Sequence, residues 1–223
     1  FTGHPLTDEV IADKTRPQAR SQLKIDDITT VGLFTGSRSG EIKRVLPILL
    51  ETAKLIRQQR ADVQFVLPVA KTVKDEDLKP FYSALNELSV STTKEPFYDV
   101  IQACDVILTA SGTATLEIGL LNVPMVIVYR IAAFSYFTLS RLVNIKHLGL
   151  VNIILGREVV KEFVQHEARP SNIAKEALKL LNDKKYYESM QHELSLLRHQ
   201  LGDGEGSKNA AKLALEMMQQ PYS

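Results

Sequence analysis

Two continuous apolar runs separated by a helical stretch form the clearest pattern in the chain, between residues 105 and 130. Each run predicts a buried strand, one at Asp105–Thr109 and one at Met125–Tyr129. Between them, the small residues Ala110–Gly112 predict a turn, and Thr113–Asn122 predicts a helix that is apolar on almost every side. Strands that are apolar on both faces and joined by helices are typical of a parallel sheet covered by helices on both sides.

The same alternation of apolar runs and helical stretches continues before and after this region. Earlier in the chain, Thr30–Phe34 predicts a strand that runs into a turn of small residues, Thr35–Gly40, and a helix follows from Glu41. The pattern predicts an α/β fold, a Rossmann-like doubly wound parallel sheet with helices on both faces and extra C-terminal helices. The other predicted elements are strands at Val63–Val69, Leu88–Thr92 and Gly149–Ile154, and helices at Asp75–Asn86, Phe97–Ala103, Glu158–Gln165, Ser171–Asn182, Lys185–Leu201 and Ser207–Gln219.

The first residues differ from this repeating pattern. Residues 1–29 are polar and charged, and we expect a linker with one short helix there. The chain begins with Phe1 rather than methionine, and FTGHP is typical of a strand end that runs into a turn, so we expect the later part of a longer protein. Residues 30–201 are predicted to form the sheet domain, and residues 202–223 a C-terminal loop and helix that bridges to the preceding half.

Composition narrows the class of protein. The chain has 223 residues, 44% of them hydrophobic, which is typical of a globular domain with a sizeable core. A net charge of +1 argues against a dedicated nucleic-acid-binding protein. Cys104 is the only cysteine, which excludes an internal disulfide, and its position before a buried strand predicts a core residue rather than a nucleophile. The sequence contains no signal-peptide pattern and no apolar run of bilayer-spanning length, so we expect a cytoplasmic protein.

Two turns of small residues, Gly36–Gly40 and Ala110–Thr113, each end a strand and open a helix. In doubly wound sheets, ligands bind beyond the carboxyl ends of the strands, and free N–H groups at helix starts favour phosphate. Arg38 in the first turn suits phosphate oxygens because a guanidinium binds them through two parallel hydrogen bonds. The sequence therefore predicts a phosphate site between the two turns.

Glu117 is the only charged residue between Asp105 and Arg130. Because a buried carboxylate needs a partner, two interpretations follow. In the first, Glu117 accepts hydrogen bonds from sugar hydroxyls beside the phosphate site. In the second, Thr113 caps the helix and Glu117 pairs with a structural arginine or lysine. The pattern alone favours neither interpretation.

Other catalytic and cofactor motifs do not occur in the sequence. The five histidines have no metal-ligand spacing, so we expect no metal site. The first turn lacks the lysine of a P-loop, and no glycine-rich dinucleotide fingerprint, GxSxG or HExxH motif occurs, so we expect no cofactor. Residues 130–147 combine aromatic and basic side chains, which suits either a membrane-facing surface or an ordinary core helix, and composition favours the core helix.

Five ordered segments resemble the lipid-A-disaccharide synthases, and the resemblance spans residues 2–220. The segments are GHPLTDE at 3–9, GSRSGEI at 36–42, ASGTATLE at 110–117, NVPMVIVYR at 122–130 and LVNIILGREVVKEFVQ at 150–165. Thr35 and Val151 depart from the family pattern, which usually has proline at both positions. Because proline stiffens the backbone, these departures concern loop geometry more than chemistry.

The resemblance implies the C-terminal half of a GT-B glycosyltransferase, with roughly the first 160 residues of the family pattern missing. Such enzymes transfer 2,3-diacylglucosamine from UDP-2,3-diacylglucosamine to 2,3-diacylglucosamine 1-phosphate, with inversion at the anomeric carbon and without a metal. They work as peripheral proteins at the cytoplasmic face of the inner membrane of Gram-negative-type bacteria. The implied partners are both lipid substrates and the inner-membrane surface, with a homodimer as a candidate assembly and no nucleic acid.

The resemblance also implies roles for individual residues. The UDP-sugar site comprises Gly36, Ser37, Arg38, Ser111, Gly112, Thr113 and Thr115 at the diphosphate, with Glu117 at the ribose hydroxyls. Candidate substrate-binding residues without an assigned contact are Asn152, Arg157, Glu158 and Gln165. The general base is expected in the half that precedes this sequence, so we predict that the chain alone binds UDP weakly and lacks transferase activity.

Two alternatives stay open. A UDP-sugar epimerase would share the architecture, although the pairing of SGTATLE with NIILGRE argues against it. A non-catalytic nucleotide-binding or assembly module would keep the same turns without the reaction.

Overall fold

A computed structural model describes residues 3–130, 147–202, 204 and 206–219 of the chain. Within them, six parallel strands form one sheet in the order β3-β2-β1-β4-β5-β6. This confirms the predicted α/β fold with a parallel sheet. The strands are β1 (Thr29–Phe34), β2 (Val63–Pro68), β3 (Ser91–Thr93), β4 (Val106–Ala110), β5 (Met125–Tyr129) and β6 (Glu162–Val164).

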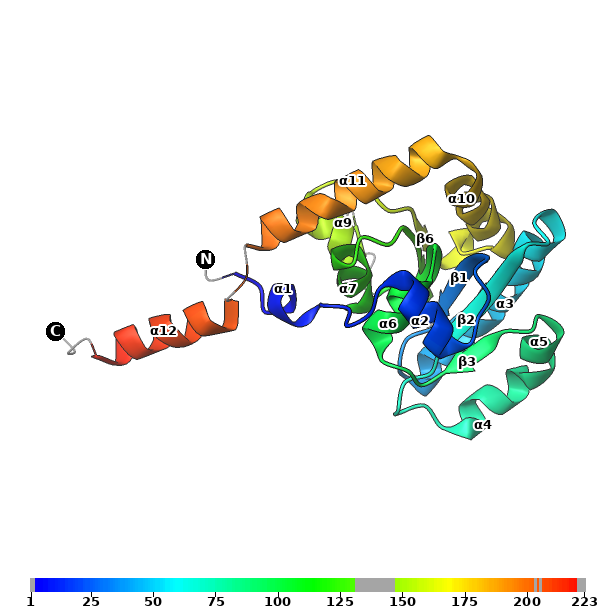
Figure 1. The fold of residues 1–223 in the computed structure, drawn as a ribbon, viewed down its shortest axis with the longest axis horizontal. Helices are drawn as coiled ribbons and strands as arrows, with labels where there is room; N and C mark the ends of the chain where they lie inside the picture. Colours follow the sequence, from blue (N-terminus) through cyan, green and yellow to red (C-terminus); the bar gives the residue numbers. More distant parts are fainter. Residues whose placement is uncertain (1–2, 131–146, 203, 205, 220–223) are drawn as a thin grey trace.

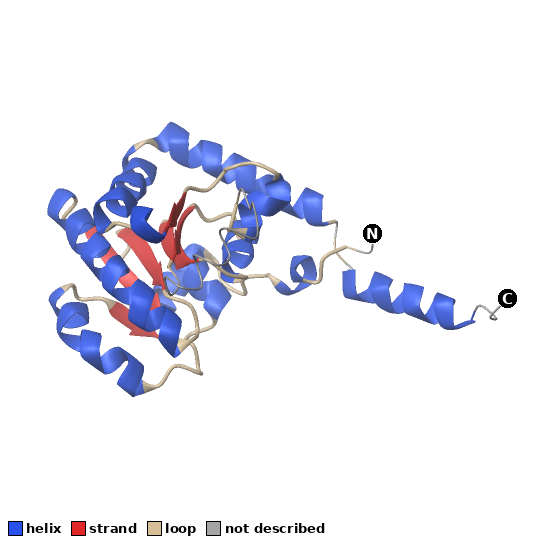
Figure 2. Cartoon of the chain, turned by 180° about the vertical axis from the view of Figure 1, so that it is seen from behind, coloured by secondary structure: helices blue, strands red, loops and turns tan. Residues whose placement is uncertain are grey.

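Helices cover both faces of the sheet (Figures 1 and 2). On one face, α3 and α10 pack against each other and against the central strands. The other face is covered by α6 and α7. Helix α2 packs on α6, and α9 and α11 pack on α7. The helices are α1 (Leu6–Glu9), α2 (Arg16–Leu23), α3 (Ser39–Gln59), α4 (Asp75–Leu78), α5 (Tyr82–Glu87), α6 (Phe97–Ala103), α7 (Ala114–Leu120), α9 (Leu150–Leu155), α10 (Pro170–Asn182), α11 (Lys184–Leu201) and α12 (Gly206–Gln219), with short 3-10 helices η1 (Lys79–Phe81) and η2 (Gln165–Glu167).

The core lies between the sheet and its two helical layers. Leu33, Ile107 and Val126 on the central strands are fully buried, because both faces of a parallel sheet are covered. Each such side chain contributes about 1.5–3 kcal/mol through the removal of apolar surface from water. Cys104 is also fully buried, and burial raises the pKa of its thiol, which confirms it as a core residue.

The order of the strands places a topological switch point between β1 and β4. These two strands pair in parallel, with Phe34 opposite Thr109. From the end of β1 the chain turns through α3 toward β2, and from the end of β4 it turns through α7 toward β5. The two connections lie on opposite faces of the sheet, and open α/β sheets bind ligands at such a switch point, beyond the carboxyl ends of the strands.

Two predicted elements near residues 149–165 are wrong. Gly149–Ile154 was expected to be the last strand, but Leu150–Leu155 forms α9; Glu158–Gln165 was expected to be a helix, but it contains β6. The cause is a contact between the two segments: Glu162 on β6 accepts hydrogen bonds from the backbone N–H groups of Leu148 (2.7 Å) and Gly149 (3.1 Å). This carboxylate supplies the helix start with an acceptor from outside the helix, which a short apolar run does not reveal.

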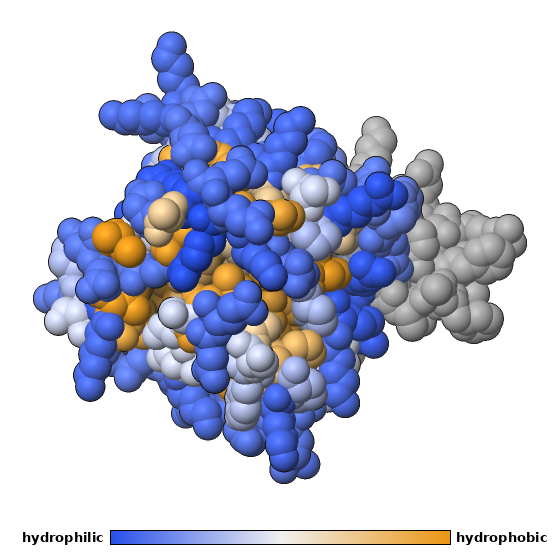
Figure 3. Space-filling view, turned by 90° about the vertical axis from the view of Figure 1, so that its right-hand side faces the viewer, coloured by the Kyte–Doolittle hydropathy of each residue, from blue (hydrophilic) through white to orange (hydrophobic). Residues whose placement is uncertain are grey.

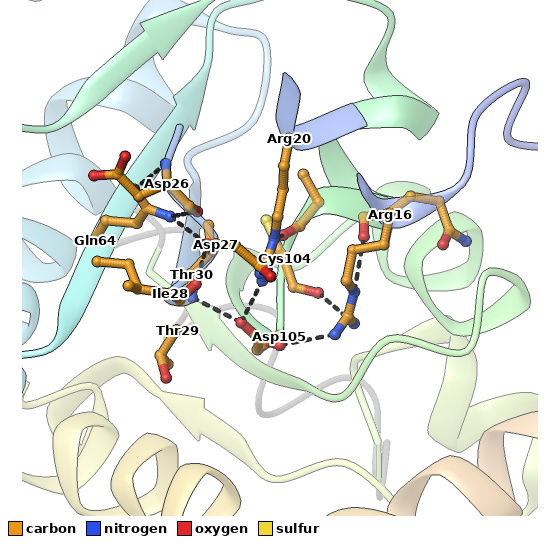
Figure 4. A network of polar contacts seen from close by, with 12 residues as sticks. Arg16, Arg20, Asp26, Asp27, Ile28, Thr29, Thr30, Gln64, Cys104 and Asp105 are labelled. Atoms are coloured by element: carbon orange, nitrogen blue, oxygen red, sulfur yellow. Dashed lines mark hydrogen bonds and ion pairs between the residues drawn. The ribbon is translucent and has the colours of Figure 1, made fainter. Parts of the chain in front are cut away.

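The segment before the sheet is more regular than the expected linker, because it contains two helices, α1 and α2. Helix α2 is joined to the amino end of β4 through Arg20, which is 7% exposed and donates to the carbonyl of Ala103 and to Asp105. Figure 4 shows Asp105 at the centre of this network, where it also accepts from Arg16 and from the N–H of Thr30 at the start of β1.

Other differences from the predicted elements are smaller. The predicted helix over residues 75–86 is divided into α4, η1 and α5, and the predicted strand over residues 88–92 is shifted to β3. The proposed aromatic surface or core helix at 130–147 lies mainly outside the described residues. The division into residues 1–29, 30–201 and 202–223 stays a prediction.

The surface of the described chain is mixed in character. On the side drawn in Figure 3, polar side chains surround smaller apolar areas. Helix α12 extends away from the layered body in both ribbon views, and Leu213, Leu215 and Met218 are exposed on it. In the part of the chain that the structure describes, no helix is both long and apolar enough to span a bilayer.

Candidate functional site

The first turn, between β1 and α3, is shaped by Gly36 and Glu41. Gly36 has a φ of +87°, a left-handed conformation that favours glycine. The carboxylate of Glu41 folds back over it, and Oε2 accepts from the backbone N–H groups of Ser37 (3.2 Å) and Arg38 (3.4 Å). Two of the N–H groups that we expected at the diphosphate therefore already have an internal acceptor, and the turn is held in one shape.

The guanidinium of Arg38 projects from this turn into solvent. Its side chain is 84% exposed, and its nearest partner is Glu41, with 3.5 Å between Nη1 and Oε1. An exposed ion pair of this kind contributes less than about 1 kcal/mol, so it does not hold the guanidinium against a competing anion. The loop after β2 also stabilises the turn, because the Thr72 hydroxyl donates to the carbonyl of Ser37 (3.0 Å).

The second turn, between β4 and α7, presents small residues at the neighbouring strand end. Gly112 and Thr113 are exposed, and a Cβ added at Gly112 would meet no atom within 4 Å. The Ser111 hydroxyl donates to the carbonyl of Leu148 (3.2 Å), and the buried Thr115 hydroxyl donates to that of Gly112 (2.8 Å). Ser111 and Thr115 therefore shape the turn, while Gly112 and Thr113 form its open rim.

Glu117 lies one turn into α7 and is half-buried. Its Oε1 accepts a hydrogen bond from the Tyr98 hydroxyl on α6 (3.2 Å). Burial raises the pKa of Glu117, and the charge of Glu9 adds to the effect, while the Tyr98 hydrogen bond opposes it. Desolvation, together with the charge of Glu117, raises the pKa of Tyr98 to about 12. Among the described residues Glu117 has no arginine or lysine partner, and Thr113 makes no side-chain cap of α7, so the structural interpretation of this pair is not supported.

The sheet brings the two turns together, as predicted. Because β1 and β4 are parallel neighbours at the centre of the sheet, the turns that follow Phe34 and Ala110 lie side by side at its carboxyl-terminal edge, where all the strands end. An aromatic contact also links this edge to Glu117: the rings of Phe34 and Phe97 are 5.3 Å apart, and those of Phe97 and Tyr98 are 6.2 Å apart. The edge thus holds an exposed guanidinium, an open small-residue turn and a half-buried carboxylate.

Of the other four candidates, the structure places only Gln165 at this edge, directly after β6. Arg157 and Glu158 precede β6 at the opposite, amino end of the sheet, where they pair with Glu193 and Lys161. The structure therefore separates these two residues from the turns.

Asn152 is buried, and its amide bonds internally on every side. Nδ2 donates to the Val160 carbonyl and to Glu162 (both 2.7 Å), while Oδ1 accepts from the N–H groups of Val159 (2.8 Å) and Val160 (2.9 Å). These four bonds use the full capacity of an asparagine amide, so Asn152 has a structural role that joins α9 to β6.

Sequence reasoning missed two polar residues near the site, Tyr98 and Glu162. Tyr98 lies in no motif, and Glu162 lies in the family-like segment 150–165 without having been given a role, because each acts on a partner outside its own local pattern: Glu117 for Tyr98, and Leu148, Gly149 and Asn152 for Glu162. Across the described ranges, no cluster of three or more histidine, cysteine or acidic side chains could hold a metal ion.

Comparison with known sequences gives one consistent result. The family model described as lipid-A-disaccharide synthetase matches residues 1–217. The curated lipid-A-disaccharide synthase of Trichlorobacter lovleyi is 40% identical over 221 residues, covering 99% of this chain and 57% of the relative. That of Geobacter metallireducens is 42% identical over 219 residues, covering 98% and 57%. The chain therefore spans a little over half the length of the curated relatives that it matches.

Solved structures are similar in fold at much lower identity. A UDP-GlcNAc 2-epimerase from Neisseria meningitidis bound to UDP-GlcNAc has a TM-score of 0.64 at 16% identity, covering 96% of this chain and 54% of that one. The C-terminal domain of a group 1 glycosyl transferase from Francisella tularensis has a TM-score of 0.56 at 13% identity, covering 87% and 96%. The fold is thus that of GT-B glycosyltransferases and the related epimerases, and the fold alone does not separate these activities.

Proposed function

The chain belongs to the lipid-A-disaccharide synthase family, and we propose that it is the donor-binding half of an inverting glycosyltransferase in lipid A biosynthesis. The proposed reaction transfers 2,3-diacylglucosamine from its UDP conjugate to 2,3-diacylglucosamine 1-phosphate, forming the lipid A disaccharide and UDP. The observation that supports it most is the pairing of two small-residue turns at the switch point, with an exposed Arg38 on one and a half-buried Glu117 behind the other.

We assign the diphosphate to the space between the two turns. Arg38 would bind its oxygens through two parallel hydrogen bonds, which contribute roughly 1.5–3 kcal/mol each when charge-assisted. The rim at Gly112 and Thr113 would contact it from the other side, because both residues are exposed and a Cβ at Gly112 would meet no atom within 4 Å. Gly36, Ser37, Ser111 and Thr115 would act through the shape of the turns, since the hydrogen bonds described above stay within them.

We assign the ribose hydroxyls to Glu117. Its Oε1 accepts a hydrogen bond from Tyr98, and its Oε2 has no hydrogen-bond partner among the described residues. A carboxylate accepts from two vicinal hydroxyls, so Glu117 would select a nucleotide with an intact ribose. Ionisation of Glu117 strengthens this contact, because a charged acceptor forms the stronger hydrogen bond.

In the reaction, the acceptor hydroxyl would attack the anomeric carbon as the bond to UDP breaks on the opposite face. Negative charge then grows on the departing diphosphate, and Arg38 with the rim of the second turn would stabilise it where it forms. The attacking hydroxyl must lose its proton to a general base. We expect that base in the part of the relatives' length that this chain does not span, so this chain alone should bind UDP without transferring sugar.

The family assignment also suggests where the protein works. We place it at the cytoplasmic face of the inner membrane of a Gram-negative-type bacterium, because both proposed sugar substrates carry acyl chains. A homodimer is part of the same proposal, and light scattering of the purified chain tests it.

The alternative activity is that of a UDP-sugar epimerase, favoured by the fold of the Neisseria meningitidis enzyme. Incubation of a full-length protein that contains this chain with UDP-N-acetylglucosamine and no acceptor separates the two: a changed sugar would favour the epimerase. A non-catalytic nucleotide-binding module is distinguished by turnover once the chain is part of a full-length protein.

The proposed site is tested by UDP titration of variants in a calorimeter. Arg38→Ala and Glu117→Ala should each weaken UDP binding by at least about tenfold, as the loss of one charge-assisted hydrogen bond predicts. Lys184→Ala is a matched control, because Lys184 is 85% exposed and pairs with an acid one turn away, yet it lies at the start of α11. Unchanged affinity in both site variants, with the fold intact, would refute the assignment.

A further inference from the structure

We infer that Tyr98 is a positioning residue for donor binding: its hydroxyl holds the Glu117 carboxylate in the orientation that receives the ribose. This inference rests on the proposed function, because it assigns Tyr98 a task only if Glu117 contacts the ribose. The observation behind it is the one hydrogen bond that the described residues make to the Glu117 carboxylate, from Tyr98 Oη to Oε1 at 3.2 Å.

Tyr98 is itself held in place by the edge that carries the first turn. It follows Phe97 at the start of α6, and the two rings are 6.2 Å apart. Phe97 packs in turn on Phe34, the last residue of β1, with 5.3 Å between ring centroids. Phe34 is 2% exposed and lies two residues before Gly36. The aromatic contacts therefore fix the Tyr98 hydroxyl relative to the strand end from which Arg38 projects.

Glu117 needs such a partner, because no other side chain of the described ranges is hydrogen-bonded to its carboxylate. The other face of α7 packs on apolar side chains, namely Val151 on α9 and Leu194 and Leu197 on α11, which lie close to Gly119. Of the buried residues on β4 and β5 beneath it, all are apolar except Thr109, whose hydroxyl donates to the carbonyl of Ala110. A flexible glutamate with one hydrogen bond to a rigid phenol loses fewer conformations when the ribose binds, and this preorganisation raises affinity.

The hydroxyl also favours the ionised form of Glu117. The charged and titratable groups that act on this carboxylate are Tyr98 on α6, which lowers its pKa, and Glu9 at the end of α1, which raises it. Removal of the hydroxyl should therefore shift the ionisation of Glu117 to higher pH. The ionised carboxylate is the stronger acceptor for ribose hydroxyls, so UDP affinity should decrease as the pH is lowered and Glu117 becomes protonated. In a variant without the hydroxyl, this decrease should begin at a higher pH.

The test compares Tyr98→Phe with Tyr186→Phe. Both changes remove only a hydroxyl that donates to a glutamate, since Tyr186 bonds to Glu176 at 2.6 Å, but Tyr186 lies on α11 and contacts α10. UDP and 2′-deoxy-UDP are titrated into each chain from pH 4.5, the ordinary pKa of a glutamate above which the pKa of Glu117 lies, up to pH 8. For Tyr98→Phe we expect UDP affinity to fall about three- to tenfold, the value of one hydrogen bond, and the preference for UDP over 2′-deoxy-UDP to shrink.

The decisive readout is the pH profile. As the pH is lowered, Tyr98→Phe should begin to lose UDP affinity at a higher pH than the unmodified chain does. Tyr186→Phe should follow the unmodified profile. Protonation of UDP itself affects all three chains equally. An unchanged profile and preference in Tyr98→Phe, with Glu117→Ala still weakening UDP, would overturn the positioning role and leave the proposed function standing. If Glu117→Ala has no effect, or the unmodified chain does not bind UDP, both proposals fail.

Discussion

Gly36→Ala tests whether the first turn has the shape that the site requires. Gly36 has a φ of +87°, and an added Cβ would lie 2.2 Å from Oε2 of Glu41. Alanine therefore meets two obstacles, a left-handed backbone and an occupied volume. Glu41 must move, and its bonds to the N–H groups of Ser37 and Arg38 are then lost.

The size of the effect follows from these contacts. A left-handed backbone costs a non-glycine residue about 1–2 kcal/mol. Loss of the Glu41 bonds adds about 1 kcal/mol, a value reduced from that of buried charged hydrogen bonds because water reaches this turn. The free energy of unfolding should therefore fall by about 2–3 kcal/mol. With a urea m-value of roughly 2–3 kcal/mol/M, the unfolding midpoint moves down by about 1 M.

The matched control is Gly112→Ala in the second turn. Gly112 has no positive φ, and a Cβ there would meet no atom within 4 Å, so stability should change by less than about 0.5 kcal/mol. UDP binding should nevertheless weaken in this variant, because the added methyl group would enter the proposed diphosphate space. The assay is urea unfolding followed by circular dichroism, with UDP calorimetry on the folded variants. Equal urea midpoints for Gly36→Ala and the unmodified chain would refute the described turn.

Two further predictions concern residues outside the proposed site. Asn152→Ala removes four hydrogen bonds, two of them buried, and leaves the N–H groups of Val159 and Val160 without their acceptor. It should destabilise the chain by about 2–4 kcal/mol in urea unfolding, and a smaller loss than that of Lys184→Ala would contradict its structural role. Asp105→Ala removes an ion-pair partner of the buried Arg20 and should lower the free energy of unfolding by about 2–3 kcal/mol. UDP affinity should stay unchanged, because Asp105 lies at the amino ends of the strands. Weakened UDP binding in folded Asp105→Ala would contradict this placement.

Local patterns predicted the centre of the fold well. The strand, turn, helix and strand between residues 105 and 129 are β4, a turn, α7 and β5, because each apolar run is buried on both faces and its neighbours are small. The meeting of the two turns also followed from pattern alone, since parallel strands end at one edge. The predictable part of the fold was thus the part in which the local pattern of apolar and small residues determines the element.

The parts that could not be predicted depend on contacts between distant residues. Helix α9 and strand β6 were interchanged because Glu162 and Asn152 determine their structure across a loop, and a six-residue apolar run suits either element. The partner of Glu117 was missed for the same reason, since Tyr98 is separated from it by 19 positions. Likewise, Glu41 already satisfies N–H groups that the sequence suggested were available for phosphate.

The most direct test of the donor site is a crystal structure of this chain soaked with UDP. The account predicts the diphosphate between the turns at Arg38 and Thr113, with the ribose hydroxyls within hydrogen-bonding distance of Glu117. UDP bound elsewhere on the chain, or with its ribose away from Glu117, would contradict it.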